Sequence, residues 1–289
     1  MGSSQQLKAR IRSVKNTKQI TKAMQMVAAS KMRRAQDIDK ASAAYTHAAN
    51  ELLTYFASQG VTDNHPLFKK RPIKSRLLIV IAADKGLAGA YNSNVLKAYS
   101  KELLSDKKEG ITNITIGVGR RAAQFATRLK DVEVIGVYED LPDRPAGYQL
   151  RAMLDTAIDT FASEEVDAVD VVYTEFINSI TQKVTTKRVL PAGFEPTEVS
   201  STVRDALYEP NAEAVLDSAT YRLVGAQIFQ SLLDARASEY SMRMVAMKNA
   251  TDNASDLVED LTLAMNKSRQ SAITQELAEI SGGVEALSE

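Results

Sequence analysis

The chain has 289 residues, 44% of them apolar, with 36 basic and 36 acidic side chains and no cysteine. This length and apolar content allow a sizeable buried core, and the lack of cysteine excludes disulfides, thiolate metal sites and cysteine nucleophiles. The longest apolar run, Leu77 to Ala83, is too short to cross a bilayer, and the polar start does not resemble a secretory signal, so we expect an intracellular chain without a membrane span.

The first segment, residues 6–58, contains no glycine or proline. Its small and apolar positions recur at alternating spacings of three and four residues, interrupted by Lys31, at Leu7, Ile11, Val14, Met24, Ala28, Ala35, Ile38, Ser42, Tyr45, Ala49, Leu52 and Phe56. This period predicts a helix that lies along one partner helix. Because Gly60 ends the pattern, we assign residues 1–60 to an N-terminal coiled-coil helix.

Charge is distributed unevenly along the chain. Residues 1–40 carry ten basic and two acidic side chains, whereas residues 250–289 carry eight acidic and two basic ones. A basic stripe is typical of phosphate binding, but this one lacks interleaved aromatic residues for base stacking. We therefore expect no nucleic acid, and favour an acidic protein surface or the acidic third segment as its partner.

The second segment, residues 61–211, alternates strands with helices. Apolar, mostly β-branched runs predict strands at 77–82, 114–118, 132–137 and 168–174, with helices near 93–104, 120–129 and 148–162 between them. This order predicts a Rossmann-like α/β domain with a parallel sheet. A further strand, 183–190, is expected to pair with its predecessor at an edge, and 191–210 is expected to form a loop.

Glycines after the first strand, in Asp84-Lys85-Gly86-Leu87-Ala88-Gly89, suggest phosphate binding at a helix N-terminus. The spacing matches neither the dinucleotide-binding pattern nor the P-loop pattern. We favour a tight turn with Asn92 as helix cap.

No catalytic constellation is visible in the sequence. His47 lies in the middle of a helix and His65 in a turn, and the pairs Glu164-Glu165 and Glu259-Asp260 lack metal-ligand spacing. We therefore assign no catalytic, cofactor-binding or metal-ligating residues.

The third segment, residues 212–289, keeps one alternation of four and three over 219–272. It predicts a coiled-coil helix that pairs antiparallel with the first segment and places Leu7 opposite about residue 263. The last twenty-five or so residues would then project by roughly 35–40 Å without a partner helix. An isolated helix is marginal in water, so a partner should enclose it. The methionines at positions 24 and 26 could form an adaptable binding surface or coiled-coil packing, whereas packing is favoured for Met244 and Met247.

Three stretches, residues 17–34, 84–94 and 246–279, together resemble gamma subunits of bacterial F-type ATP synthases, and the likeness covers nearly the whole chain. The resemblance implies a non-catalytic rotary central stalk. It would couple proton flow through a membrane ring of c subunits to ATP synthesis in an alpha/beta hexamer, together with an epsilon subunit. It would be peripheral to the cell membrane on the cytoplasmic side.

The resemblance also implies partner contacts. Met24 resembles the position that meets an acidic loop of the beta subunit. Arg269 and Gln270 resemble the pair that forms hydrogen bonds with loops of the hexamer. Thr274 and Glu276 match a terminal signature that supports assembly, and Tyr208 and Glu209 lie in the segment that docks on the ring and epsilon. Val284 departs from the usual glycine-alanine of that signature, and Ala88 replaces a common cysteine. A nucleotide-dependent enzyme with oligomerising helices and a static coiled-coil scaffold remain the alternatives.

Overall fold

The computed structural model describes residues 4–63, 65–143, 145, 147–194 and 196–286, with backbone alone for residues 4, 39–47 and 282–286. The chain divides into two compact units. Residues 28–243 form one unit, and residues 1–27 together with 244–289 form the other.

Two long helices, α1 (Ser4–Ser58) and α6 (Ala212–Ala286), contribute to both units. Between them in sequence lie five strands and four shorter helices, with one 3-10 turn at η1 (Pro66–Phe68). The strands are β1 (Ser75–Ile81), β2 (Thr112–Val118), β3 (Glu133–Tyr138), β4 (Ala168–Phe176) and β5 (Gln182–Leu190). The shorter helices are α2 (Tyr91–Glu109), α3 (Arg120–Ala126), α4 (Gly147–Ala162) and α5 (Ser201–Arg204).

The sheet of the unit 28–243 has the strand order β3-β2-β1-β4-β5. Its first four strands run parallel, and β5 pairs antiparallel with β4 at the edge. The predicted parallel α/β sheet and its antiparallel edge strand are therefore confirmed. The boundaries differ from the prediction by one to a few residues, and α2 is longer at both ends.

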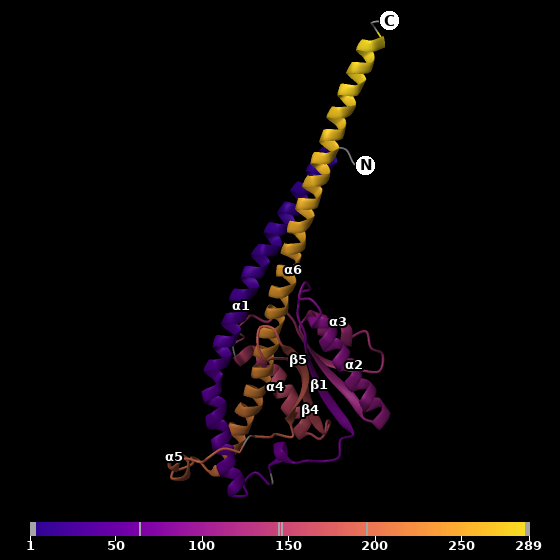
Figure 1. The fold of residues 1–289 in the computed structure, drawn as a ribbon. Coiled ribbons are helices and arrows are strands. Elements are labelled where there is room, and N and C mark those ends of the chain that lie inside the picture. The colour runs from indigo at the N-terminus through magenta and orange to yellow at the C-terminus, as the bar shows by residue number, and fades with distance from the viewer. Residues whose placement is uncertain (1–3, 64, 144, 146, 195, 287–289) are drawn as a thin grey trace. The chain divides into compact units, whose positions relative to one another are not determined.

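Helices cover both faces of the sheet (Figure 1). Leu77, Ile79 and Ile81 of β1 share a core with α4 and α6, whereas Leu78 and Val80 pack with α2 and α3. Successive side chains of a strand point to opposite faces, so a strand covered on both sides is apolar at every position. This explains the continuous apolar run that predicted the strand.

A buried ion cluster fixes α2 to the sheet. Arg76 of β1 donates to Asp106 of α2 at 3.0 Å and to Glu102 at 2.9 Å, and it also bonds Asp170 of β4. Arg188 of β5 approaches the same Asp170. Three carboxylates thus compensate two guanidinium groups, as buried charges require.

The lower part of α6 has both α1 and the sheet as neighbours. Leu216 and Leu223 pack with Leu53 and Phe56 of α1, while Val224 and Ile228 join the core beneath the sheet. Residues 231–241 are consequently buried nearly all the way round, with Asp234 half-buried. A coiled-coil seam alone predicts a single buried stripe, so here the sheet adds a second one.

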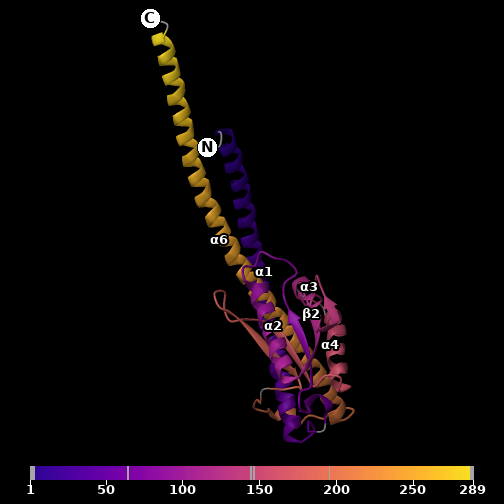
Figure 2. The same ribbon diagram turned by 90° about the vertical axis from the view of Figure 1, so that its right-hand side faces the viewer.

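In the unit of residues 1–27 and 244–289, α1 and α6 lie side by side and antiparallel (Figure 2). The more buried positions of α6 follow the predicted seam, at Met244, Met247, Thr251, Ala254, Val258, Leu261, Met265 and Ser268. The hydroxyl groups of Thr21 and Thr251 meet at 2.8 Å. An antiparallel register through this pair places Leu7 opposite about residue 265, close to the predicted 263.

Two local predictions were wrong. Asn92 does not cap α2, because it lies inside the first turn and its Oδ1 accepts from the Ala83 amide at 2.9 Å, while the cap residue Ala90 makes no side-chain bond. The stretch 191–210 is not all loop, because Ser200 accepts from the Val203 amide and starts the short helix α5. Both errors concern side chains whose hydrogen-bond partners the sequence does not reveal.

Candidate functional site

Asp84 follows β1 and connects the loops that follow three neighbouring strands, β1, β2 and β3. Its Oδ1 accepts from the amide of Arg120, after β2, at 3.0 Å and from the amide of Asp140, after β3, at 3.1 Å. These loops meet at the carboxyl edge of the parallel strands. In open α/β sheets this edge is where ligands bind, close to the point at which the strand order reverses.

In this chain side chains of α6 lie at that edge. Arg236 approaches Asp84 Oδ2 at 3.7 Å and donates to the carbonyl of Leu141 at 3.0 Å. Arg243 donates to the carbonyl of Gly86 at 3.2 Å and to Glu239 at 2.6 Å. The glycine-containing loop therefore holds a helix of its own chain, which is why its spacing differs from that of nucleotide-binding loops.

A second set of contacts attaches α1 to the same edge. Lys31 of α1 forms an ion pair with Asp143 at 2.9 Å, and the hydroxyl of Tyr240 of α6 donates to the same carboxylate. Lys31 was the interruption in the apolar pattern of the first helix. Its partner explains the interruption, because a charged side chain at a helix–helix contact needs a compensating group.

We call this group of contacts the sheet–helix joint, defined by Lys31, Asp84, Asp143, Arg236, Glu239, Tyr240 and Arg243. It contains three cationic and three carboxylate side chains, so its formal charges balance. Arg236 and Glu239 are buried, with 9% and 4% exposure.

The joint favours the charged forms of Asp143 and Arg236. Burial acts against ionisation of Asp143, but its bonds from Tyr240 and Lys31 lower the pKa of this carboxyl overall. Burial also opposes the charge on Arg236, but Glu239, Tyr240 and Asp84 together outweigh this effect, so the pKa of Arg236 is raised. Burial and then the bond to Asp143 raise the pKa of Tyr240, which keeps its hydroxyl a donor.

Backbone geometry brings the loops close together. Leu87 and Gly89 in the first loop have φ of 63° and 56°, and Gly119 after β2 has φ of 85°. A Cβ on Gly119 would lie 2.1 Å from the carbonyl oxygen of Ala82, so this position requires glycine.

The residues expected to contact a catalytic hexamer lie on the helices of the other unit. Met24 is half-buried on the seam, whereas Met26 is 60% exposed. Residues 269–281 are exposed without exception, which includes Arg269, Gln270, Thr274 and Glu276. On this stretch the apolar side chains Ile273, Leu277 and Ile280 are 50–64% exposed at spacings of four and three.

The basic side chains at the start of α1 stay exposed. Among the described residues of this unit, none of the lysines and arginines between 8 and 22 forms an ion pair with a carboxylate of α6. The described carboxylates of the acidic third segment therefore form no ion pair with these side chains, and the external acidic surface stays a prediction.

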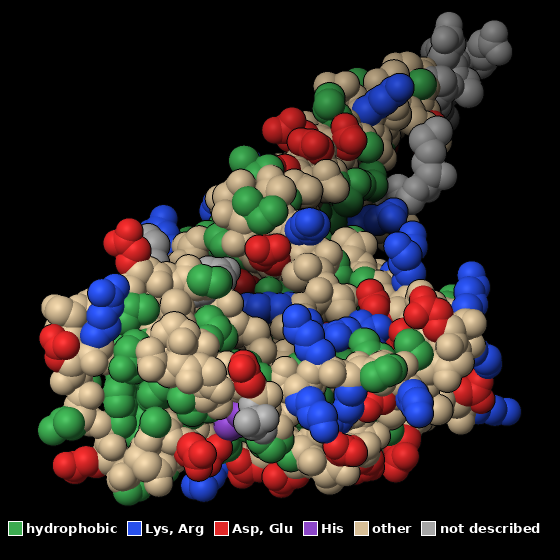
Figure 3. Space-filling view, turned by 90° about the horizontal axis from the view of Figure 1, so that it is seen from below, with side chains coloured by type: hydrophobic (Ala, Val, Ile, Leu, Met, Phe, Trp, Pro, Cys, Tyr) green, Lys and Arg blue, Asp and Glu red, His purple; other side chains and the backbone are tan. Residues whose placement is uncertain are grey.

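The residues expected at a ring-facing foot differ in exposure. Tyr208 stacks on Tyr55 and Phe56 of α1, with ring centroids 5.9 and 5.0 Å apart, and its hydroxyl donates to Val203 at 2.5 Å. Its neighbour Leu207 is 92% exposed and Glu209 is exposed. Figure 3 shows apolar side chains gathered at the surface on the side where α5 lies. Tyr208 thus anchors this segment while its neighbours face outward.

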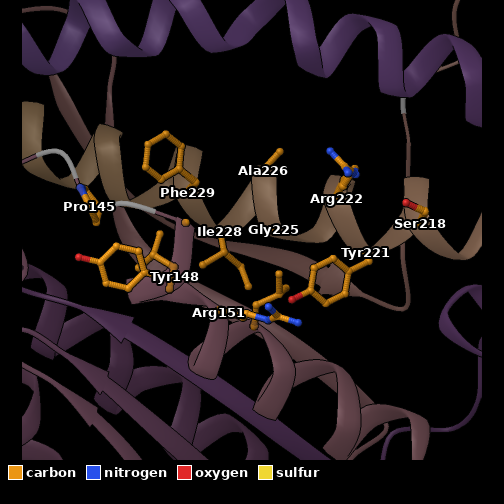
Figure 4. A pocket seen from close by; sticks show the side chains of 13 residues that line it. Pro145, Tyr148, Arg151, Ser218, Tyr221, Arg222, Gly225, Ala226, Ile228 and Phe229 are labelled. Carbon is orange, nitrogen blue, oxygen red and sulfur yellow. The ribbon is translucent and has the colours of Figure 1, made fainter.

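A groove between α4 and α6 has a volume of about 760 Å³ (Figure 4). Its walls are mostly apolar, with Leu154, Ile228 and Phe229 among them. Two of its polar side chains share a carboxylate beside the groove, since the hydroxyl of Tyr221 donates to Asp155 at 2.7 Å and Arg151 lies 3.6 Å from the same residue.

The structure shows the surroundings of His65 and of the four carboxylates considered above. His65 accepts from the Leu67 amide and bonds Asp217 at 2.8 Å, so it caps η1. Glu164, Glu165, Glu259 and Asp260 are exposed.

Among the described residues no group of three or more acidic or histidine side chains could hold a metal, and no helix combines the length and apolar character needed to cross a bilayer. The side chain of His47 lies outside the described residues.

Comparisons with known proteins extend over the whole chain. Residues 3–287 match the protein family described as ATP synthase. The chain is 37% identical to the ATP synthase gamma chain of Ralstonia nicotianae and 38% identical to that of Staphylococcus carnosus, each across 99% of this chain and all of the relative.

Solved structures share the fold. The OSCP/F1/c-ring structure of Euglena gracilis mitochondrial ATP synthase matches with a TM-score of 0.66 and 19% identity, over 98% of this chain and 94% of that one. The central stalk of Tetrahymena thermophila mitochondrial ATP synthase matches with a TM-score of 0.60 and 23% identity, over 80% of this chain and 99% of that one. With full-length identities above a third, this chain belongs to the ATP synthase gamma-chain family.

Proposed function

We propose that this chain is the rotary central stalk of an F-type ATP synthase, coupling proton translocation through a ring of c subunits to ATP synthesis or hydrolysis in an alpha/beta hexamer. The observation that carries this role is the exposed helix of residues 269–281, with its apolar positions Ile273, Leu277 and Ile280. A lone helix with an apolar stripe is marginal in water and requires an enclosing partner. The cavity of a hexamer would supply one.

Contacts with the hexamer are assigned to the helical unit. Met24 would meet an acidic loop of a beta subunit, and the exposed basic residues around it would attract that loop over several ångströms. Arg269 and Gln270 would bond loops of the hexamer, with Thr274 and Glu276 supporting assembly. A pair of helices presents different side chains in different directions, so rotation changes the contacts of each catalytic subunit in turn.

Contacts with the ring and with an epsilon subunit are assigned to the segment around Tyr208 and Glu209. Packing on Tyr55 and Phe56 makes this segment rigid enough to receive force. The complex would place the chain at the cell membrane, peripheral and on the cytoplasmic side. Residues 1–60 and 212–289 would serve as the shaft and residues 61–211 as the globular part.

Catalysis would belong to the beta subunits. The competing enzyme hypothesis needs a nucleotide at the carboxyl edge of the sheet. Arg236 and Arg243 of α6 lie at that edge and bond its loops, which disfavours the hypothesis.

Substitution of Met24 tests the assigned contact. Met24→Lys adds attraction to an acidic loop, so we expect fewer protons pumped per ATP hydrolysed in inverted vesicles, with assembly retained. Met26→Lys is the matched control, because it adds the same charge at an exposed position on another face of the helix. Full coupling in Met24→Lys, or an equal loss in both variants, would remove the assigned contact.

A further inference from the structure

We propose that the sheet–helix joint locks the parts of both long helices that lie within the unit 28–243, residues 28–58 of α1 and 212–243 of α6, to the sheet against twisting. This inference rests on the proposed rotary function and adds to it the residues that resist torsion. It gives the loop around Asp84 a mechanical role.

The first support is the position of the joint within its unit. The unit 28–243 ends at Arg243, a joint residue, and begins three residues before Lys31, another joint residue. Both long helices therefore carry a joint residue at the limit of this unit.

The second support is the kind of contact. Below the joint, α6 meets the sheet through apolar side chains such as Val224, Ile228 and Leu232, whose attraction has no preferred direction. At the joint, hydrogen bonds from charged side chains to loop carbonyls and to Asp143 fix distances and angles together. Arg236 and Arg243 hold α6 to the loops, and Lys31 holds α1, so each helix has its own directional attachment.

The third support is the way the joint resists rearrangement. Asp84 and Asp143 come from loops that follow different strands, and Asp84 is itself held by two backbone amides. Rotation of either helix would separate buried or half-buried opposite charges, which is unfavourable in a medium poorer in water than the surface. Apolar contacts could instead slide by small steps.

The test uses charge exchange between Lys31 and Asp143. This pair is partly exposed, at 39% and 29% for the two side chains, so its variants are expected to fold. Lys31→Asp places two carboxylates face to face, and the double variant Lys31→Asp with Asp143→Lys restores an attractive pair. Lys107→Met is the control, because it breaks the exposed ion pair with Asp131, remote from both long helices.

The readout is torsional fluctuation in the assembled complex. The chain has no cysteine, so Glu165→Cys provides a single exposed attachment for a bead while the hexamer is immobilised. If the attachments of α1 and α6 contribute equally to the torsional stiffness, Lys31→Asp removes one of the two and should give a roughly twofold larger angular variance. The charge-exchanged variant should fall below Lys31→Asp but stay above the parent, because it lacks the bond from Tyr240 to Asp143. Lys107→Met should match the parent.

The outcomes separate this inference from the proposed function. A parent chain that does not assemble with the hexamer overturns the rotary function itself. A Lys31→Asp complex that assembles with unchanged angular variance overturns the lock. A charge-exchanged variant whose variance is as large as that of Lys31→Asp overturns it as well. If Lys31→Asp fails to assemble, Tyr240→Phe replaces it. That variant removes a single bond to Asp143 and should give a smaller increase, so an unchanged variance in it overturns the lock as well.

Discussion

Thr21 of α1 and Thr251 of α6 join the two long helices through their hydroxyl groups, with 2.8 Å between the oxygens. Both residues are buried, and Thr251 also donates to the carbonyl of Met247 in its own helix at 2.8 Å. A polar pair within an otherwise apolar or small-residue seam specifies one register, because any slip would bury both hydroxyl groups without their partner.

This pair should show coupled energetics. Thr251→Val or Thr21→Val leaves one buried hydroxyl without its partner across the interface and should cost about 1 kcal/mol in the free energy of unfolding. The double variant replaces both by groups of the same shape and should cost less than the sum. Denaturant titration of the four chains measures this, and strictly additive losses would show that the hydroxyl groups do not interact.

Tyr91 and Tyr99 give a matched comparison of two buried phenols. Among the described residues the hydroxyl of Tyr91 has no hydrogen-bond partner, whereas that of Tyr99 bonds Thr115 at 2.8 Å. Tyr91→Phe should therefore change the free energy of unfolding by less than about 0.5 kcal/mol, and Tyr99→Phe should lower it by about 1 kcal/mol. The reverse order in thermal unfolding would contradict this assignment.

Alanine substitutions at Gly119 and Gly110 distinguish the energetic cost of steric overlap from that of an unfavourable backbone conformation. Both have positive φ, 85° and 74°, but a Cβ on Gly119 would overlap the Ala82 carbonyl while one on Gly110 would meet no atom within 4 Å. Gly110→Ala should cost about 1 kcal/mol, the usual penalty for a left-handed alanine. Gly119→Ala should cost at least about 3 kcal/mol, since the backbone must also move. Equal losses in calorimetry would show that the close approach is not present.

Asp143 should make stability depend on pH in acid. Its pKa is lowered in the folded chain, so its contribution is complete above the ordinary value of 3.8 and is lost as pH falls through the folded value. The free energy of unfolding should fall less steeply between about pH 4 and about pH 2 in Lys31→Met than in the parent. Lys22→Met, at an exposed position, is the control, and equal slopes in all three chains would contradict the contribution of Lys31.

The regular part of the fold follows from periodicity alone. A spacing of three and four residues identified both long helices, and their lengths and shared attachment to the α/β part gave the antiparallel register to within two residues. Apolar runs identified four of the five strands, and the alternation over 183–190 identified β5. Thr21 was not predicted as a seam position because it is polar, although it lies seven residues after Val14. The burial of α6 all round was also missed, because a seam pattern describes one partner and the sheet is a second.

The joint could not be derived from the sequence. Its residues come from α1, α6 and two loops, and ion pairs between such distant positions have no local pattern. One signal was available, the charged Lys31 in an apolar seam. The role expected for Asn92 failed for the same reason, since its partner Ala83 lies nine residues away in a loop whose course depends on the sheet.

The most direct test of the central-stalk role is to locate residues 264–286 in a complex reconstituted from the full chain with alpha and beta subunits, by electron cryomicroscopy, alongside its ATPase activity. The central-stalk role predicts a stable, active complex with this stretch enclosed in the hexamer cavity and Ile273, Leu277 and Ile280 covered by the surrounding subunits. A complex that does not form, a stretch left in solvent, or ATP hydrolysis by the chain alone would contradict it.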